Sequence, residues 1–297
     1  MKPVASIFAF FALLVISAPS RAQSALIGIF EAASAGKAES LGKPGVRVLF
    51  YQFGQQWSSY DANCADEVCL KTIGHLFPPV TTWTLVRFGK PIAKVTATTP
   101  PTFHFYSEIG VQTISNPGTL ANLEPRPRAG VQEPPHTILA TTFTTLSDPD
   151  NWQSSGLLPY DLTRVRESFH KAFPHPNNCI VNGKALPKYQ PWTYADTDIK
   201  LNASYLSSRG WRLAQLTLGG YLCDGPPDAD FLDQWFAISP SGEILHIGRV
   251  MHLVGAADFA HDGRSELLFS NQSDNNGGYE LFYDNFSHSA QAVVTFH

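Results

Sequence analysis

Short apolar segments alternate with turn-forming residues through most of this chain, and this pattern limits the folds open to it more than any other feature. The 297 residues include 22 Gly and 22 Pro, and 12% are aromatic. Branched and aromatic residues favour extended backbone, whereas Gly and Pro end it in tight turns. We therefore predict a mainly β fold of antiparallel hairpins, either propeller-like or sandwich-like.

Strands and hairpins can be placed from the same alternation. Each predicted hairpin joins two apolar runs through Gly, Pro, Asn or Ser, residues that suit tight turns. The hairpins lie at 81–97, 234–248 and 266–283, and single strands are predicted at 46–53, 103–106, 110–114, 137–146, 212–218 and 293–296. We find no internal repeat of fixed period, which makes a regular propeller the weaker expectation.

One segment has helical periodicity instead. Apolar residues recur three and four positions apart between Asp161, which suits a helix N-terminus, and Pro174, which ends a helix. These apolar residues are Leu162, Val165, Phe169, Ala172 and Phe173. The sequence therefore predicts one short helix near 161–173, packed on a sheet.

Proline is concentrated between residues 116 and 135, where it occupies five positions. Because proline fixes φ and lacks a backbone donor, we predict a loop or extended linker there. The domain prediction is a single β-rich domain at 23–297. If the linker separates two units, they are 23–115 and 137–297.

The first 22 residues have the order of an export signal. Lys2 supplies a positive charge, and Val4–Ile16 is an uncharged run of about 13 residues, shorter than the roughly 20 needed to span a bilayer. Small residues then precede a predicted cleavage site between Ala22 and Gln23. We expect a secreted or periplasmic protein without a transmembrane segment after removal of the signal. A retained N-terminal anchor is the alternative.

Cysteine usage agrees with export. The four cysteines are Cys64, Cys69, Cys179 and Cys223. An even number in an exported chain favours disulfides, and four cysteines allow three connectivities. One of them pairs Cys64 with Cys69 and Cys179 with Cys223. A zinc site is the alternative, although its cysteines are usually closer together and accompanied by His.

The charge of the chain argues against one class of partner. Removal of the signal takes away Lys2 and Arg21, which changes the net charge from −4 to −6, and no basic run is present. Nucleic-acid binding needs a cationic surface that displaces counterions. We therefore expect no nucleic-acid partner, which leaves a protein or carbohydrate ligand open.

The most informative local chemistry is an acidic loop at residues 258–266, Asp-Phe-Ala-His-Asp-Gly-Arg-Ser-Glu, next to an apolar run. It resembles the FG-GAP or VCBS calcium loop of integrin-α-like propeller blades, whose pattern is Asp-x-Asp/Asn-x-Asp-Gly-x-x-Asp. Asp258, Asp262 and Glu266 match the first, third and last acidic positions. Gly263 matches the glycine.

The resemblance implies a calcium site that lacks one ligand. Calcium takes about 6–8 oxygens, and Ala260 stands where a second Asp or Asn belongs. The predicted ligands are the side chains of Asp258, Asp262 and Glu266 and the backbone carbonyl of Arg264, with Ca²⁺ as the only expected cofactor. In the structural alternative, both aspartates merely hydrogen-bond the turn and Glu266 faces solvent.

A wider C-terminal stretch is similar to a group of exported bacterial proteins of unknown function. The segments that carry this likeness are Cys223-Asp-Gly-Pro-Pro-Asp228, Gln234-Trp-Phe-Ala237 and Gly277-Gly-Tyr-Glu-Leu-Phe-Tyr-Asp284. The resemblance implies a bacterial origin and brings no activity with it.

Two further sets of residues suggest other functions. Four aspartates at 224–233 could supply the carboxylate pair of a glycosidase-like hydrolase, or could simply form turns in a Gly-Pro-Pro loop. The six tryptophans could include a sugar-binding platform. Trp152 lies in a polar loop and is the best candidate for it, whereas Trp83 and Trp235 lie in predicted strands and are expected in the core.

Taken together, these features favour a non-catalytic exported protein with a binding or structural role. The sequence contains no Gly-x-Ser-x-Gly elbow and no phosphate-binding glycine loop followed by Lys. We therefore predict no catalytic residue. A secreted hydrolase that uses residues 224–233, or a carbohydrate-binding module, is the alternative.

Overall fold

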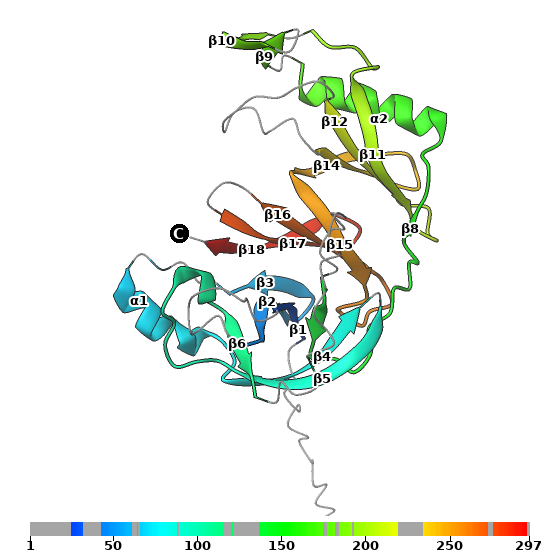
Figure 1. Cartoon of the computed structure of the whole chain (residues 1–297). Helices are drawn as coiled ribbons and strands as arrows, with labels where there is room; N and C mark the ends of the chain where they lie inside the picture. Colours follow the sequence, from blue (N-terminus) through cyan, green and yellow to red (C-terminus); the bar gives the residue numbers. More distant parts are fainter. Residues whose placement is uncertain are drawn as a thin grey trace, which may run out of the picture.

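The protein is built from four stacked layers, a barrel, two sheets and a helix (Figure 1). The computed structural model describes residues 25–31, 43–60, 64, 66–87, 89–115, 120, 137–174, 177–181, 184–191, 193–218, 234–272 and 276–295. The predicted export signal and most of the Pro-rich stretch lie outside these residues. The prediction of a mainly β, antiparallel fold is confirmed.

The first layer is a closed antiparallel barrel. Its strands are β1 (Leu26–Glu31), β2 (Gly45–Phe53), β3 (Gln56–Ser59), β4 (Val80–Arg87), β5 (Lys90–Thr98), β6 (Val111–Ile114) and β7 (Leu139–Thr141). They pair in the order β1-β7-β4-β5-β6-β2-β3, and the ring closes because β1 also pairs with β2. The predicted hairpin at 81–97 is confirmed as β4 and β5.

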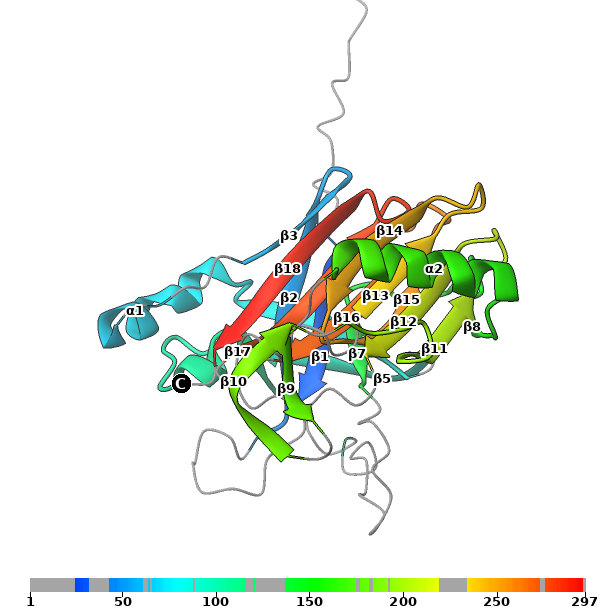
Figure 2. The same ribbon diagram turned by 90° about the horizontal axis from the view of Figure 1, so that it is seen from above.

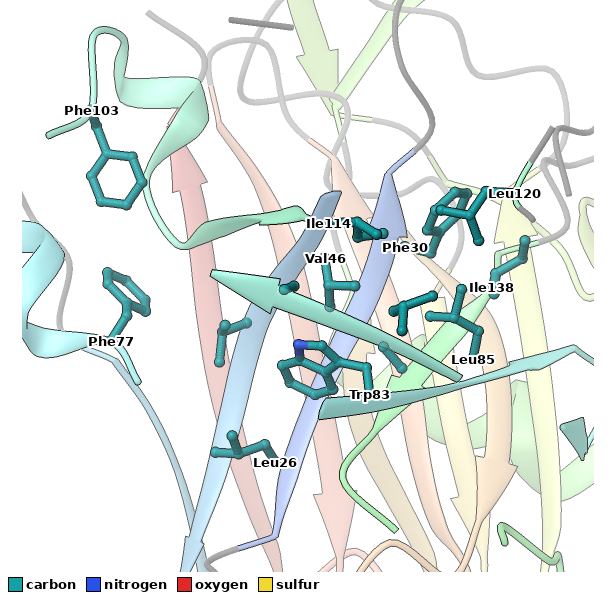
Figure 3. Close-up of a cluster of buried hydrophobic side chains, with 14 of the residues drawn as sticks. Leu26, Phe30, Val46, Phe77, Trp83, Leu85, Phe103, Ile114, Leu120 and Ile138 are labelled. Carbon is teal, nitrogen blue, oxygen red and sulfur yellow. The ribbon is translucent and has the colours of Figure 1, made fainter. Parts of the chain in front are cut away.

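Large apolar side chains fill the barrel (Figure 3). Phe30, Val46, Trp83 and Leu85 are all buried there. The indole Nε1 of Trp83 donates a 2.8 Å hydrogen bond to Oε1 of Gln112, so the main polar atom of this core has a partner. The interior is therefore a packed core.

Short helical segments cover part of the barrel. They are α1 (Glu67–Thr72), η2 (Ile73–Leu76) and η3 (Tyr106–Glu108). Leu70 and Ile73 join the buried cluster of the barrel. The predicted strand at 103–106 is wrong, because the backbone N–H of His104 donates to the Glu108 carboxylate (2.9 Å) and turns the chain into η3.

Two antiparallel sheets follow the barrel. The outer sheet has the order β14-β13-β12-β11-β8 and contains β8 (Gln153–Ser154), β11 (Ile199–Leu206), β12 (Arg212–Leu218), β13 (Gln234–Ile238) and β14 (Ile244–Arg249). The inner sheet contains, in chain order, β15 (Met251–Ala257), β16 (Glu266–Gln272), β17 (Asn276–Tyr283) and β18 (His288–Thr295). A separate hairpin is formed by β9 (Asn177–Val181) and β10 (Lys184–Pro191). The predicted hairpins at 234–248 and 266–283 are confirmed.

The inner sheet is apolar on both faces. Alternate residues of a strand point to opposite sides, and the two faces belong to different buried clusters. The cluster against the barrel includes Ile27, Leu49, Leu268 and Leu281. The cluster against the outer sheet includes Leu213, Trp235, Phe269 and Phe282. The inner sheet is therefore the centre of the stack.

The helix α2 (Pro159–Ala172) covers the far face of the outer sheet (Figures 1 and 2). Val165 and Phe169 are fully buried against that sheet, so the helix prediction is confirmed. Asp161, predicted to cap the helix, instead lies in its first turn and contacts Nη1 of Arg212 at 2.5 Å. No helix among the described residues is long and apolar enough to cross a membrane.

Candidate functional site

The acidic loop connects β15 and β16 and is closed by its own side chains. The two carboxylate oxygens of Asp258 accept hydrogen bonds from the N–H groups of Asp262 (2.9 Å) and Gly263 (3.0 Å). Asp262 in turn accepts a hydrogen bond from the N–H of Arg264 (2.9 Å). Positive φ angles at His261 (56°) and Gly263 (82°) make the sharp turn. The aspartates therefore hold the loop as Asx-type turns.

Glu266 is buried beneath this loop, although the structural alternative expected it to face solvent. It is 4% exposed, and its Oε2 accepts hydrogen bonds from the N–H groups of Phe259 (2.7 Å) and Ala260 (3.4 Å). Burial raises the pKa of Glu266 to about 7; the hydrogen bond from Phe259 opposes this shift, and the negative charge of Asp262 adds to it. The carboxyl is thus held by backbone donors in a desolvated position.

A second acidic segment, residues 147–152, is joined to this loop through Ser265. The hydroxyl of Ser265 donates to Oδ1 of Asp148 (2.5 Å) and accepts from the N–H of Asp150 (3.2 Å). The N–H of Ser265 donates to Oδ2 of Asp150 at 3.2 Å. These reciprocal bonds link residues more than a hundred positions apart in the chain.

Arg209 completes the arrangement from the turn between β11 and β12. Its Nε lies 2.6 Å from Oδ1 of Asp150, and its Nη2 donates to the carbonyl oxygen of Gly263 at 2.6 Å. Asp150 is 6% exposed, and the guanidinium of Arg209 supplies the opposite charge to this buried carboxylate. We call the contact of residues 147–152, 207–210 and 258–265 the three-loop junction.

The junction connects three of the four layers. Residues 147–152 lead from the barrel to β8, residues 207–210 connect β11 and β12 of the outer sheet, and residues 258–265 connect β15 and β16 of the inner sheet. Two backbone hydrogen bonds add to the side-chain contacts. The N–H of Ser208 donates to the carbonyl of Asp150 (2.7 Å), and the N–H of Asp258 donates to the carbonyl of Ser147 (2.7 Å).

The predicted calcium ligands are only partly gathered. Asp258, Asp262 and Glu266 belong to one loop, but the oxygens described above accept backbone N–H groups. The Arg264 side chain points toward Asp284, with 3.3 Å between Nη1 and Oδ1, and this contact does not involve the backbone carbonyl predicted as a ligand. Within the described part of the chain, no three His, Cys, Asp or Glu side chains are placed to hold a metal. Calcium binding remains a prediction.

One predicted disulfide is present. The Sγ atoms of Cys64 and Cys69 are 2.12 Å apart and their Cα atoms 5.4 Å apart. Asp66 caps α1 inside this small loop and accepts a hydrogen bond from the N–H of Cys69. Cys223 is not among the described residues, so the Cys179–Cys223 pairing stays a prediction. The aspartates at 224–233 also lie outside the described ranges.

The tryptophans do not form an exposed row in the described part of the chain. Trp57, Trp83 and Trp235 are buried. Trp152, the predicted sugar platform, is half-buried and meets Phe286 edge-on with ring centroids 6.2 Å apart. This arrangement favours core packing over a sugar-binding role for these tryptophans.

Sequence reasoning missed the partners of the acidic loop. Asp148 and Asp150 lie in a polar loop, Arg209 belongs to no motif, and Ser265 occupies an unspecified position of the acidic loop. Their separation along the chain leaves no local spacing that predicts the contact. No protein-family model matches the chain, and the searches of curated proteins and of solved structures also found no match. The functional argument therefore depends on the geometry of the junction.

Proposed function

We propose that this is a non-catalytic exported protein with a binding or structural role, in which the three-loop junction locks the barrel and the two sheets into one rigid body. The observation that carries this proposal is the buried carboxylate of Asp150. It contacts Arg209 of the outer sheet and Ser265 of the inner-sheet loop. One side chain thus links segments of separate layers.

The free-energy cost of burying a charge supports a role for Asp150 in fixing the layers relative to one another. A buried carboxylate is costly unless ionic and hydrogen-bonding partners surround it, and removal of one partner leaves the others unpaired. Truncation of Asp150 would leave Nε of Arg209 without its carboxylate and the Ser265 N–H without its acceptor. The junction therefore favours one arrangement of the layers over others.

Truncation of Asp150 tests this role. We expect Asp150→Ala to lower the free energy of unfolding by about 2–3 kcal/mol, measured by urea denaturation, because the junction loses its buried acceptor. The matched control is Asp196→Ala, which breaks the pair with His170 at the surface and should cost less than about 1 kcal/mol. Equal effects of the two substitutions would contradict the proposal. A stable Asp150→Ala protein that loses a ligand would assign this residue to a binding site instead.

Calcium binding by the acidic loop is the second candidate function. The observation that favours it is the loop conformation, in which Asp258, Asp262 and Glu266 all accept backbone N–H groups of one sharp turn with positive φ at Gly263. Asp258, Asp262, Glu266 and the backbone carbonyl of Arg264 would hold the ion. Outside the cytoplasm, even a site with a dissociation constant of about 10⁻⁴–10⁻³ M would be occupied.

Calorimetric titration of CaCl₂ into the purified protein tests this second function. We expect binding heat and a higher melting temperature for the wild-type protein, and loss of both in Asp262→Ala, because that substitution removes one of the three carboxylates. Absence of heat and of any change in melting temperature in the wild type would remove calcium from the proposal. The structural role of Asp150 would be unaffected by that outcome.

A further inference from the structure

The outer edge of β18 has chemistry that the three-loop junction does not use. An edge strand presents unpaired backbone N–H and C=O groups, and proteins usually protect such edges by shortness, bulges, charges or Pro. The other edge strands of the barrel and of the two stacked sheets have such protection. β3 has four residues and β8 has two. β14 and β15 are edge strands of different sheets, are separated by Val250 at φ 49°, and each pairs with a register shift.

β18 lacks each of these protections. Its eight residues pair one-to-one with β17 without a register shift. Its sequence, His-Ser-Ala-Gln-Ala-Val-Val-Thr, contains no Lys, Arg, Asp, Glu or Pro. β18 ends the inner sheet, and no backbone hydrogen bond from another described segment reaches its outer edge.

One face of β18 is anchored while the other is open. Ala290 and Ala292 are buried in the cluster that also contains Trp57 of β3. Figure 2 shows the strand crossing over β2 and β3 in this way. Gln291 is exposed, and Val293 is 64% exposed despite its apolar side chain. The barrel therefore holds the strand in an extended conformation, ready to pair.

We propose that β18 pairs with β18 of a second copy of this chain, antiparallel about a two-fold axis, so that two inner sheets become one. In such a pair both copies contribute the same short segment to the interface, so β18 faces β18. A charge near the axis would lie close to its own copy, and like charges destabilise strand pairing. Residues 289–295 carry no charge, so no register of this pair brings like charges together. The proposal is independent of the role of the three-loop junction.

Sedimentation velocity over a series of protein concentrations tests the proposal. The variants are Gln291→Lys and Val293→Lys on the edge of β18. The control is Thr82→Lys, which adds the same charge at an exposed position of β4, a barrel strand that is not part of the inner sheet. We expect the wild type and the control to dimerise equally, and the edge variants to raise the dimer dissociation constant roughly ten-fold or more.

Two results would overturn the proposal. One is a wild-type protein that stays monomeric at all concentrations, and the other is a dimer that forms equally well in the edge variants. Circular dichroism and melting temperature establish that each variant is folded. Hydrogen exchange gives a readout without substitution. Amides of residues 289–295 should exchange more slowly at high than at low protein concentration, and protection that is independent of concentration would contradict self-pairing.

Discussion

At the scale of single residues, Glu266 beneath the acidic loop makes the folding stability depend on pH. Its carboxyl is buried and accepts hydrogen bonds from two backbone N–H groups. Burial raises its pKa to about 7, above the value of the unfolded chain. The folded protein therefore keeps this proton at pH values where the unfolded chain has lost it, and stability from this group decreases as pH rises from about 4.5 to 7.

Glu266→Gln should remove this pH dependence, because glutamine has a similar shape and does not titrate. We expect the unfolding free energy of the wild type, relative to the variant, to fall by at most about 3 kcal/mol between about pH 5 and 8. Urea denaturation at several pH values measures it. Glu243→Gln, at an exposed position, is the control. A difference between wild type and Glu266→Gln that does not vary with pH would contradict this assignment.

Single residues also show where sequence reasoning stops. The turn-forming role of Asp258 and Asp262 could be predicted, since an Asp side chain bonds backbone groups a few positions away. The burial of Glu266 could not, because it depends on the pairing of Glu266 with Ala257 across two strands. The role of Asp150 depends on Arg209 and Ser265, which only the packed layers bring together.

At the scale of elements, β17 and β18 meet in an unusually close approach at Gly278. A Cβ atom there would lie 2.2 Å from the carbonyl oxygen of Ala292, which belongs to the neighbouring strand. The sequence suggested that this glycine serves a turn, because it ends the run Asp-Asn-Asn-Gly-Gly. In the structure it lies within β17 and pairs with Val293. Its lack of a side chain is needed for contact between strands.

Gly278→Ala should therefore destabilise the inner sheet. We expect a loss of about 2 kcal/mol or more in the free energy of unfolding, because the backbone must shift to accommodate the methyl group. Gly156→Ala is the matched control, since a Cβ atom at Gly156 would meet nothing within 4 Å. Chemical denaturation of both variants checks the prediction. Equal stability would show that β17 and β18 can separate without cost.

Local signals explain which elements could be predicted. The hairpin of β4 and β5 and the helix α2 were found because apolar periodicity and turn residues lie within a short window. The helix α1 has six residues, too few to show periodicity. The stretch from Phe103 to Tyr106 is rich in aromatic residues and resembles a strand, but Glu108 binds the backbone N–H groups that a strand would have used.

At the scale of the whole molecule, the mainly β class followed from composition, but the arrangement of layers did not. In the barrel, β1 joins β7 where Ile27 pairs with Thr141, across more than a hundred residues. No local pattern specifies such a pairing. The order of the layers depends on which apolar faces pack together. In the sequence each face appears only as alternating apolar residues, which does not show its packing partner.

The central position of the inner sheet has a consequence for how the chain reaches its final state. Its strands lie at 251–295, after the barrel at 26–141 and the outer sheet at 153–249. Because synthesis starts at the N-terminus, the barrel and the outer sheet are made before the inner sheet. Their apolar faces stay uncovered until residues 251–295 are available to pack between them. Assembly thus ends with the middle layer. A chain truncated before residue 251 would expose the apolar faces of both the barrel and the outer sheet to other molecules and would be prone to aggregate.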